Sequence, residues 1–269
     1  MKLNEFYALL DGIAPKRLSD EYCASTGAYD NSGILVDTGE EINSVLFTLD
    51  LTNSALDKAM EIGANLIVTH HPVIYGKISD ITQDDLLGRK LVRCIRNGIS
   101  VVSMHLNLDV AKDGIDESLM QGICLSAGEM KGAGTRLSLL HPVSDGAYGR
   151  AYDVKETTLG ALAEGMKKTF STDRVLVYGD RAKRINRVAS FCGAGADEET
   201  LRFAKTQGAD VVVSSDFKHH LISYVLEEGM QIIVLTHYAS EQYGFKKYYE
   251  KIRLQTSIPC VYHTEDELF

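Results

Sequence analysis

Three apolar stretches of the chain end in histidine, and a carboxylate follows two of these histidines by four residues. Residues 65–69 lead into His70 and His71, residues 99–104 lead into His105 with Asp109, and residues 231–236 lead into His237 with Glu241. Imidazoles and carboxylates without thiolates are the donors that divalent Zn, Fe, Mn or Ni accept. Because three independent accidents would rarely agree, the pattern predicts a metal site at strand ends.

Each cluster also has a purely structural explanation. Asp109 could cap a helix that begins near residues 113–116, and Glu241 could be the capping-box partner of the residue before its helix. His70 and His71 would point to opposite sides of an extended chain, so they can share a site only if the chain turns at Pro72. The agreement of the three clusters favours the metal interpretation.

The predicted ligands are His70, His71, Asp109, His237 and Glu241. Four or five ligands exceed what one catalytic metal needs if a position is left for water, so we expect two divalent ions. Glu241 is our candidate for the bridging carboxylate. His105 is expected to support a ligand or to face the substrate.

The elements that must position these residues alternate between strand and helix. Residues 45–49, 65–69 and 99–104 read as strands, and helical spacing of apolar residues lies between them, near residues 56–63 and 84–97. Such alternation predicts right-handed crossovers and a mainly parallel sheet, whose strands end at the same edge.

After the glycine-rich segment at residues 128–134, the chain continues with a different succession of predicted strands and helices. Because His237 and Glu241 must meet the other ligands, we expect the chain to return to the first sheet. The predicted fold is therefore α/β, with two α/β domains and mainly parallel mixed sheets. Residues 1–128 and 230–269 would form the metal-site domain, and residues 129–229 would form a second domain inserted into it.

Three further motifs have simpler interpretations. Residues 30–33, Asp-Asn-Ser-Gly, favour a turn. The glycine loop at residues 192–196 could cradle a phosphate, but it lacks a third glycine and a following Lys-Ser or Lys-Thr, so we interpret it as a tight turn. His219 and His220 resemble a second metal pair, but in mid-helix they would point about 100° apart.

Composition limits the class of protein. The 269 residues are 45% hydrophobic and 24% charged, and they carry a formal net charge of −9, which argues against long nucleic acids as partners. The five cysteines are odd in number and never spaced as a zinc pair, so they read as reduced thiols of a cytoplasmic protein. No apolar run approaches the length of a membrane span, and residues 1–5 begin no secretory signal.

The motifs resemble those of the bacterial GTP cyclohydrolase I type 2 homologues, also called the Nif-three-like family. The similarity rests on residues 69–72, on residues 105–109 with Gly114, and on residues 237–241. Residues 29–33 are similar to the family's Trp-Asp-Asn-x-Gly loop, with Tyr29 in place of tryptophan. The resemblance covers nearly the whole chain and implies a dinuclear metal site, a match for all five ligands, and a ring-shaped homohexamer.

The expected activity is that of a dinuclear metal-dependent hydrolase acting on GTP or a related nucleotide. Under the cyclohydrolase hypothesis, activated water opens the imidazole ring of GTP and releases formate, and His105 acts as a proton shuttle. Two alternatives stay open: a metal-dependent phosphoesterase, and a non-enzymatic protein that binds metal to sense or to scaffold.

Overall fold

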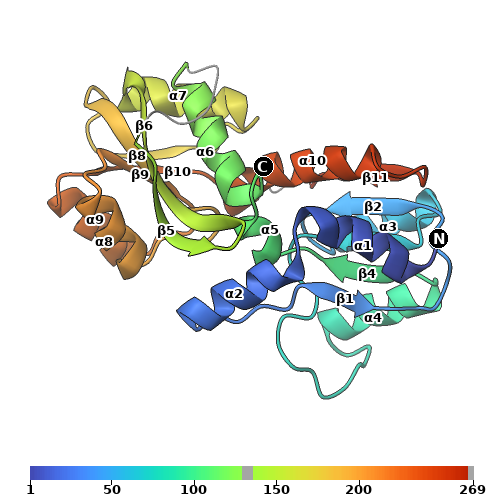
Figure 1. The fold of residues 1–269 in the computed structure, drawn as a ribbon. Helices are drawn as coiled ribbons and strands as arrows, with labels where there is room; N and C mark the ends of the chain where they lie inside the picture. The colour runs from blue at the N-terminus through green and yellow to red at the C-terminus, as the bar shows by residue number, and fades with distance from the viewer. Residues whose placement is uncertain (129–135, 266–269) are drawn as a thin grey trace. The chain divides into compact units, whose positions relative to one another are not determined.

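The computed structural model describes residues 1–128 and 136–265. The chain divides into two compact units, of which the first comprises Met1–Ala111 and Phe245–Glu265 and the second comprises Lys112–Gly244. Each unit contains one mixed sheet with helices, so the predicted α/β class is confirmed (Figure 1). Among the described residues, no helix is long and apolar enough to cross a membrane.

The first unit is built around a five-stranded sheet of order β1-β4-β3-β2-β11. Its elements are α1 (Leu3–Ile13), α2 (Lys16–Thr26), β1 (Gly33–Val36), β2 (Val45–Thr48), α3 (Asn53–Glu61), β3 (Leu66–Thr69), α4 (Leu86–Arg96), β4 (Ser100–Ser103), α5 (Leu106–Val110), β11 (Cys260–Tyr262) and the later part of α10 (His237–Arg253). Strands β11, β2, β3 and β4 run parallel and β1 is antiparallel, as the alternation of elements predicted for residues 45–104. Helix α2 was not foreseen.

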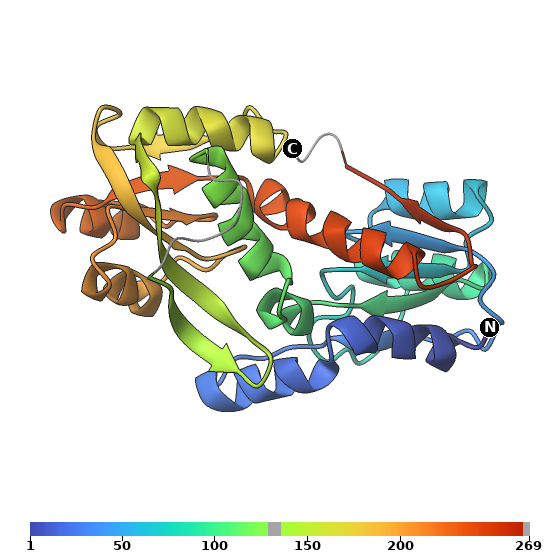
Figure 2. The ribbon, with the colours of Figure 1, turned by 45° about the horizontal axis from the view of Figure 1, so that its top comes forward.

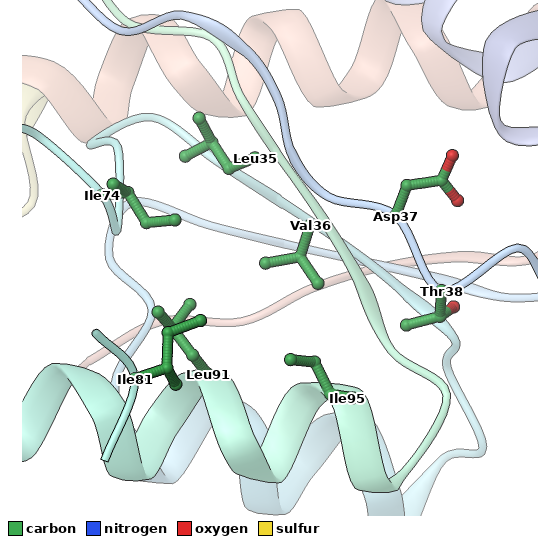
Figure 3. Close-up of a pocket in the computed structure, with 8 residues that line it drawn as sticks. All are labelled: Leu35, Val36, Asp37, Thr38, Ile74, Ile81, Leu91 and Ile95. Atoms are coloured by element: carbon green, nitrogen blue, oxygen red, sulfur yellow. The ribbon is translucent and has the colours of Figure 1, made fainter. Parts of the chain in front are cut away.

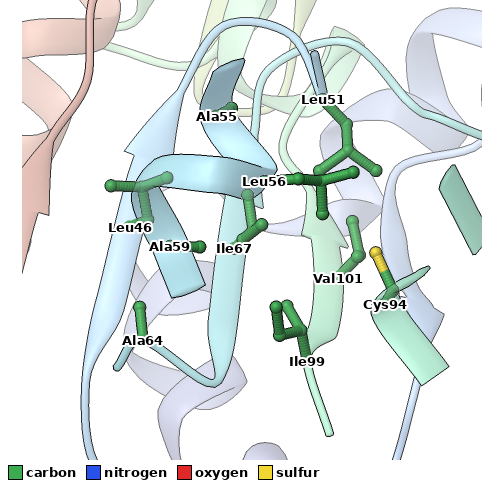
Figure 4. Close-up of a cluster of buried hydrophobic side chains, with 10 residues drawn as sticks. All are labelled: Leu46, Leu51, Ala55, Leu56, Ala59, Ala64, Ile67, Cys94, Ile99 and Val101. Carbon is green, nitrogen blue, oxygen red and sulfur yellow. The ribbon is translucent and has the colours of Figure 1, made fainter. Parts of the chain in front are cut away.

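Apolar residues cover both faces of this sheet. On one face, Leu46 and Ile67 join residues of α3 and α4 in a buried cluster that includes Leu56 and Cys94 (Figure 4). On the other face, the ring of Phe47 lies 6.3 Å from that of Phe245 in α10. Successive residues of a strand point to opposite faces, so β2 contributes side chains to both layers. The later part of α10, in red in Figure 2, runs beside the strands of this sheet.

Local signals in the sequence fix where the crossover helices begin and end. The Thr52 side chain accepts a hydrogen bond from the Ala55 amide at the start of α3, and Asp85 accepts one from the Gly88 amide at the start of α4. Gly63 and Gly98 then follow the two helices with φ of 67° and 64°, a left-handed conformation that glycine adopts without strain. The strands that follow enter the sheet in the same direction and end at the same edge.

The second unit contains a six-stranded sheet of order β5-β6-β8-β9-β10-β7. Its elements are α6 (Ile115–Ser126), β5 (Ser138–Val143), β6 (Gly146–Thr158), α7 (Leu159–Thr169), β7 (Leu176–Tyr178), β8 (Arg184–Ser190), α8 (Glu198–Thr206), β9 (Val211–Ser214), α9 (His219–Glu227), β10 (Gln231–Val234) and the beginning of α10. Strands β8, β9 and β10 are parallel to one another, and the outer pairs are antiparallel. The carboxyl ends of β8, β9 and β10 therefore share one edge.

The division of the chain differs from the predicted boundaries. Strand β10 lies between β9 and β7 in the second sheet, whereas we expected residues 230–269 to return to the first. The repeated strand–helix order from β8 to β10 explains this, because each right-handed crossover adds the next parallel strand to the same sheet. Helix α6 also belongs to the second unit, and the predicted boundary after residue 128 adjoins residues 129–135, which lie outside the described part of the chain.

A buried ion pair stabilises the second unit. The carboxylate of Asp116 on α6 is fully buried, and it accepts hydrogen bonds from the Arg150 guanidinium and from the backbone amides of Gly149 and Cys192. Arg150 is itself only 3% exposed. The pair therefore holds α6 against β6 and anchors the loop that follows β8.

We expect Asp116→Ala to destabilise the second unit by about 3–5 kcal/mol, because it leaves a buried guanidinium without its main partner. Asp57→Ala removes the partner of Arg93 in an exposed ion pair and should cost about 1 kcal/mol or less. Urea unfolding followed by circular dichroism would measure both variants. Equal stability of the two variants would contradict a structural role for the Asp116 carboxylate.

Candidate metal centre

His70 and His71 follow directly after β3, the central strand of the first sheet. The amide of His71 donates to the carbonyl of Leu49, and the Ser103 hydroxyl donates to the carbonyl of His70, so neighbouring strand ends hold the backbone here. His70 is fully buried and His71 is half-buried. Their ring centroids lie only 4.8 Å apart, so the chain turns as the two adjacent histidines require.

His105 and Asp109 follow β4, the neighbouring strand. His105 stands just before the short helix α5, and Asp109 lies one turn later with 4% of its surface exposed. One ring nitrogen from each of His70, His71 and His105 lies within 4.8 Å of the others, and we call these residues the three-histidine cluster. The Nε2 atom of His70 also lies 3.5 Å from a carboxylate oxygen of Asp109.

Each histidine of the cluster uses its Nδ1 atom in a hydrogen bond. The acceptors are the Met104 carbonyl for His70 at 2.8 Å, Asp50 for His71 at 2.9 Å and Asp30 for His105 at 2.8 Å. Carbonyl and carboxylate oxygens only accept, so Nδ1 carries the proton and a neutral ring has its lone pair on Nε2. This is the arrangement of metal-binding histidines, whose second nitrogen is normally held by such an acceptor.

The Asp30 carboxylate accepts hydrogen bonds from several side chains besides His105. It is buried, which opposes ionisation, but hydrogen bonds from His105, Ser19 and Ser32 hold the pKa of Asp30 well below its usual range. The Ser32 hydroxyl also accepts from the backbone amide of His105. The segment that the sequence indicated as a turn thus also orients a histidine of the cluster.

The second unit has its own pair of donors, at the carboxyl edge of β8, β9 and β10. His237 is the first residue of α10, and its Nε2 atom lies 3.0 Å from a carboxylate oxygen of Glu241, which is 3% exposed. The Nδ1 atom of His237 is 2.6 Å from the carboxylate of Asp216, which follows β9. The one-turn spacing of His237 and Glu241 therefore places both on one side of α10, as predicted.

The glycine loop after β8 makes room for this pair. Gly193 has a φ of 56°, and a Cβ atom at this position would lie 2.4 Å from a carboxylate oxygen of Glu241 and 3.3 Å from Nε2 of His237. A side chain would therefore displace both donors. The loop is a turn, as the sequence indicated, but the space it leaves serves the donors beside it.

The structure also shows where the other histidine pair and two cavities lie. His219 and His220 are the first two residues of α9, not mid-helix, and both are exposed. In the first unit, a cavity of about 430 Å³ between β1 and α4 has mainly apolar walls, including Ile74 and Ile95, and none of the predicted ligands (Figure 3). A second cavity, of about 300 Å³, is lined by His71, Asp50 and Lys90.

The structure gathers His70, His71, His105 and Asp109 in the first unit and pairs His237 with Glu241 in the second. Sequence reasoning missed the three carboxylates that hold the imidazoles, which are Asp30, Asp50 and Asp216. The signal available for Asp50 was position, because it directly follows the strand predicted at residues 45–49.

Comparison with known proteins places the chain among relatives of matching length. A curated GTP cyclohydrolase 1 type 2 homolog from Clostridium perfringens is 32% identical over 256 residues, which cover 94% of this chain and 92% of the relative. A curated Protein NIF3 homolog from Schizosaccharomyces pombe is 28% identical, over 82% of this chain and 80% of its own.

Solved structures have the same fold. The reduced HcgD protein of Methanocaldococcus jannaschii superposes with a TM-score of 0.80 at 26% identity and 97% coverage of both chains. A Bacillus cereus protein related to NIF3 gives a TM-score of 0.79 at 19% identity, over 98% of this chain and 97% of that one. Because the family Duf34/NIF3 (NGG1p interacting factor 3) also matches residues 1–265, this chain belongs to the Duf34/NIF3 family.

Proposed function

We propose that the protein is a dinuclear metal-dependent hydrolase that acts on GTP or a related nucleotide. The observation that carries the proposal is the three-histidine cluster, in which each Nδ1 proton is given to a fixed acceptor. Membership of a family with GTP cyclohydrolase 1 type 2 homologs among its members supports the choice of substrate.

The residues that would hold two divalent ions are His70, His71, Asp109, His237 and Glu241, and Glu241 is the carboxylate that both ions would share. Neutral imidazoles with two buried carboxylates suit Zn, Fe, Mn or Ni better than Mg or Ca, which prefer oxygen donors. Bound ions would polarise the substrate and lower the pKa of water toward neutrality. The role of the histidine ligands is to hold the Nε2 lone pairs in fixed directions, which the hydrogen bonds donated by Nδ1 secure.

His105 is proposed to transfer a proton from the attacking water to the leaving atom. Asp30 keeps the proton of His105 on Nδ1, so Nε2 can accept a proton from an attacking water and return it to the leaving atom. The ring of His105 lies 5.2 Å from that of His70 and 5.8 Å from that of His71, measured between centroids, which places it beside two proposed ligands. Asp30 acts through His105 and is a positioning residue.

The first test is metal content. Purified protein should carry about two divalent ions per chain, and Glu241→Ala should remove most of both if this carboxylate is the bridge. Glu199→Ala changes an exposed carboxylate of the same unit and should leave metal content unchanged. One ion per chain by elemental analysis, or no loss in Glu241→Ala, would refute the bridging assignment.

The second test separates an enzyme from a metal-binding scaffold. His105→Ala should keep its metal and its circular-dichroism spectrum, and kcat on GTP should fall by about 10²–10⁴-fold, the usual contribution of a proton-transfer group. Asp30→Asn should lower kcat more than it changes KM, because it disturbs the tautomer of His105 and no substrate contact.

Product analysis by mass decides between the reactions. Release of formate from GTP supports the cyclohydrolase, and release of phosphate alone supports a phosphoesterase. If the metal-loaded wild type releases neither product from any nucleotide, the proposal of a hydrolase fails and the metal-binding scaffold becomes the better account.

The assembly is a separate proposal. We propose a homohexamer, as the resemblance to the family implies, and light scattering coupled to size-exclusion chromatography should give six times the mass of the chain. A monomer or dimer at micromolar concentration would contradict it.

A further inference from the structure

A cavity in the first unit lies directly beside the three-histidine cluster. It has a volume of about 300 Å³, and its lining includes His71 and Asp50 together with Lys90 of α4. Leu51, Val73 and Leu87 supply apolar wall. A molecule that occupies this cavity would therefore touch a proposed metal ligand and a lysine at the same time.

Lys90 is the cation of this cavity, and its environment differs from that of a surface lysine. Within residues 1–128 and 136–265, its side chain makes no hydrogen bond or ion pair, whereas the side chain of Lys58 on α3 pairs with Glu61 at 3.0 Å. Burial lowers the pKa of Lys90, and the nearby Asp50, Cys94 and Glu265 partly oppose this effect. The ammonium group has thus lost part of its hydration, and no residue within 1–128 or 136–265 supplies a hydrogen bond or ion pair that replaces it.

The acidic residues near Lys90 are engaged with other partners. Asp50 already accepts a hydrogen bond from Nδ1 of His71, and Glu265 accepts one from Thr52 and lies 3.1 Å from Nε2 of His263. In the described part of the chain, neither carboxylate forms an ion pair with Lys90, although both partly oppose the effect of burial on its pKa. An oxyanion that enters the cavity can approach closer and, beside apolar walls, can interact more strongly than it would in water.

We infer that this cavity is the anion subsite of the protein, in which Lys90 binds a phosphate group of the nucleotide while the rest of the substrate reaches the metal centre. The inference rests on the proposed function and adds the group that recognises the substrate's charge. A lysine is a point charge with three donors, which suits a phosphate group of variable orientation. The subsite would make a nucleotide a better ligand than its nucleoside.

Calorimetry on the metal-loaded protein tests this subsite without relying on turnover. Wild type should bind GMP at least tenfold more tightly than guanosine, as expected for one charge-assisted hydrogen bond. Lys90→Gln should remove most of this preference and leave guanosine binding and metal content unchanged. Lys90→Arg should retain part of it, and Lys58→Gln, which lies outside the cavity, should behave as wild type.

Inorganic phosphate provides a further arm. Phosphate binding that requires Lys90, without a preference for GMP, would show a site for free phosphate and overturn the nucleotide subsite. Equal affinity of wild type and Lys90→Gln for GMP would overturn the inference altogether, as would a wild type that binds no nucleotide. Binding that depends on Lys90 in a protein without hydrolytic activity would instead leave the subsite standing and remove only the proposed reaction.

Discussion

The donor set depends on one interaction that occurs four times, an imidazole Nδ1 proton held by a fixed oxygen. His70, His71, His105 and His237 all make it, with acceptor distances between 2.6 and 2.9 Å. Without these acceptors, each ring could rotate or change tautomer, and the lone pair on Nε2 would have no defined direction. The acceptors therefore decide whether a group of histidines can act as a set of ligands.

Parallel strands explain why the acceptors are in place. Asp50 comes shortly after β2, His70 follows β3, and Met104 follows β4, so the ends of three neighbouring parallel strands bring donors and acceptors together. The second unit uses the same arrangement, with Asp216 after β9 and His237 after β10. The Met104 acceptor is a backbone carbonyl, which any residue at this position would supply. The other acceptors are carboxylates of particular side chains, so substitutions of those residues would disturb the orientation of the imidazoles most.

The sequence indicated which histidines and carboxylates would lie close together better than it indicated the residues that support them. Strand ends are visible in sequence because apolar runs stop abruptly at His70 and His105, and the helical spacing of His237 and Glu241 placed both on one face of α10 correctly. Asp30 was interpreted only as part of a turn, because its contact with His105 joins residues 75 apart in sequence. No local pattern encodes such a contact, which depends on the antiparallel pairing of β1 with β4.

The prediction that residue 230 begins the return of the chain to the first sheet was wrong for a related reason. Strand β10 has the same apolar character as β3, and neither composition nor periodicity states which sheet a buried strand joins. Its parallel pairing with β9 and antiparallel pairing with β7 assign it to the second sheet. The first unit is completed only by the residues from Phe245 onward, within α10.

Electrostatics links the proposed metal centre to the proposed substrate. A chain with a net charge of −9 repels a nucleotide at long range, so attraction has to arise locally. Two divalent ions would exceed the formal charge of Asp109 and Glu241, but the three carboxylates of Asp30, Asp50 and Asp216 beside the histidines would outweigh that excess. The acceptors that orient the imidazoles thus weaken the field that would draw in an anion. In the described part of the chain, Lys90 is a cation without an ion-pair partner. It would restore the attraction for an anion on the side of the cluster where the cavity opens beside His71.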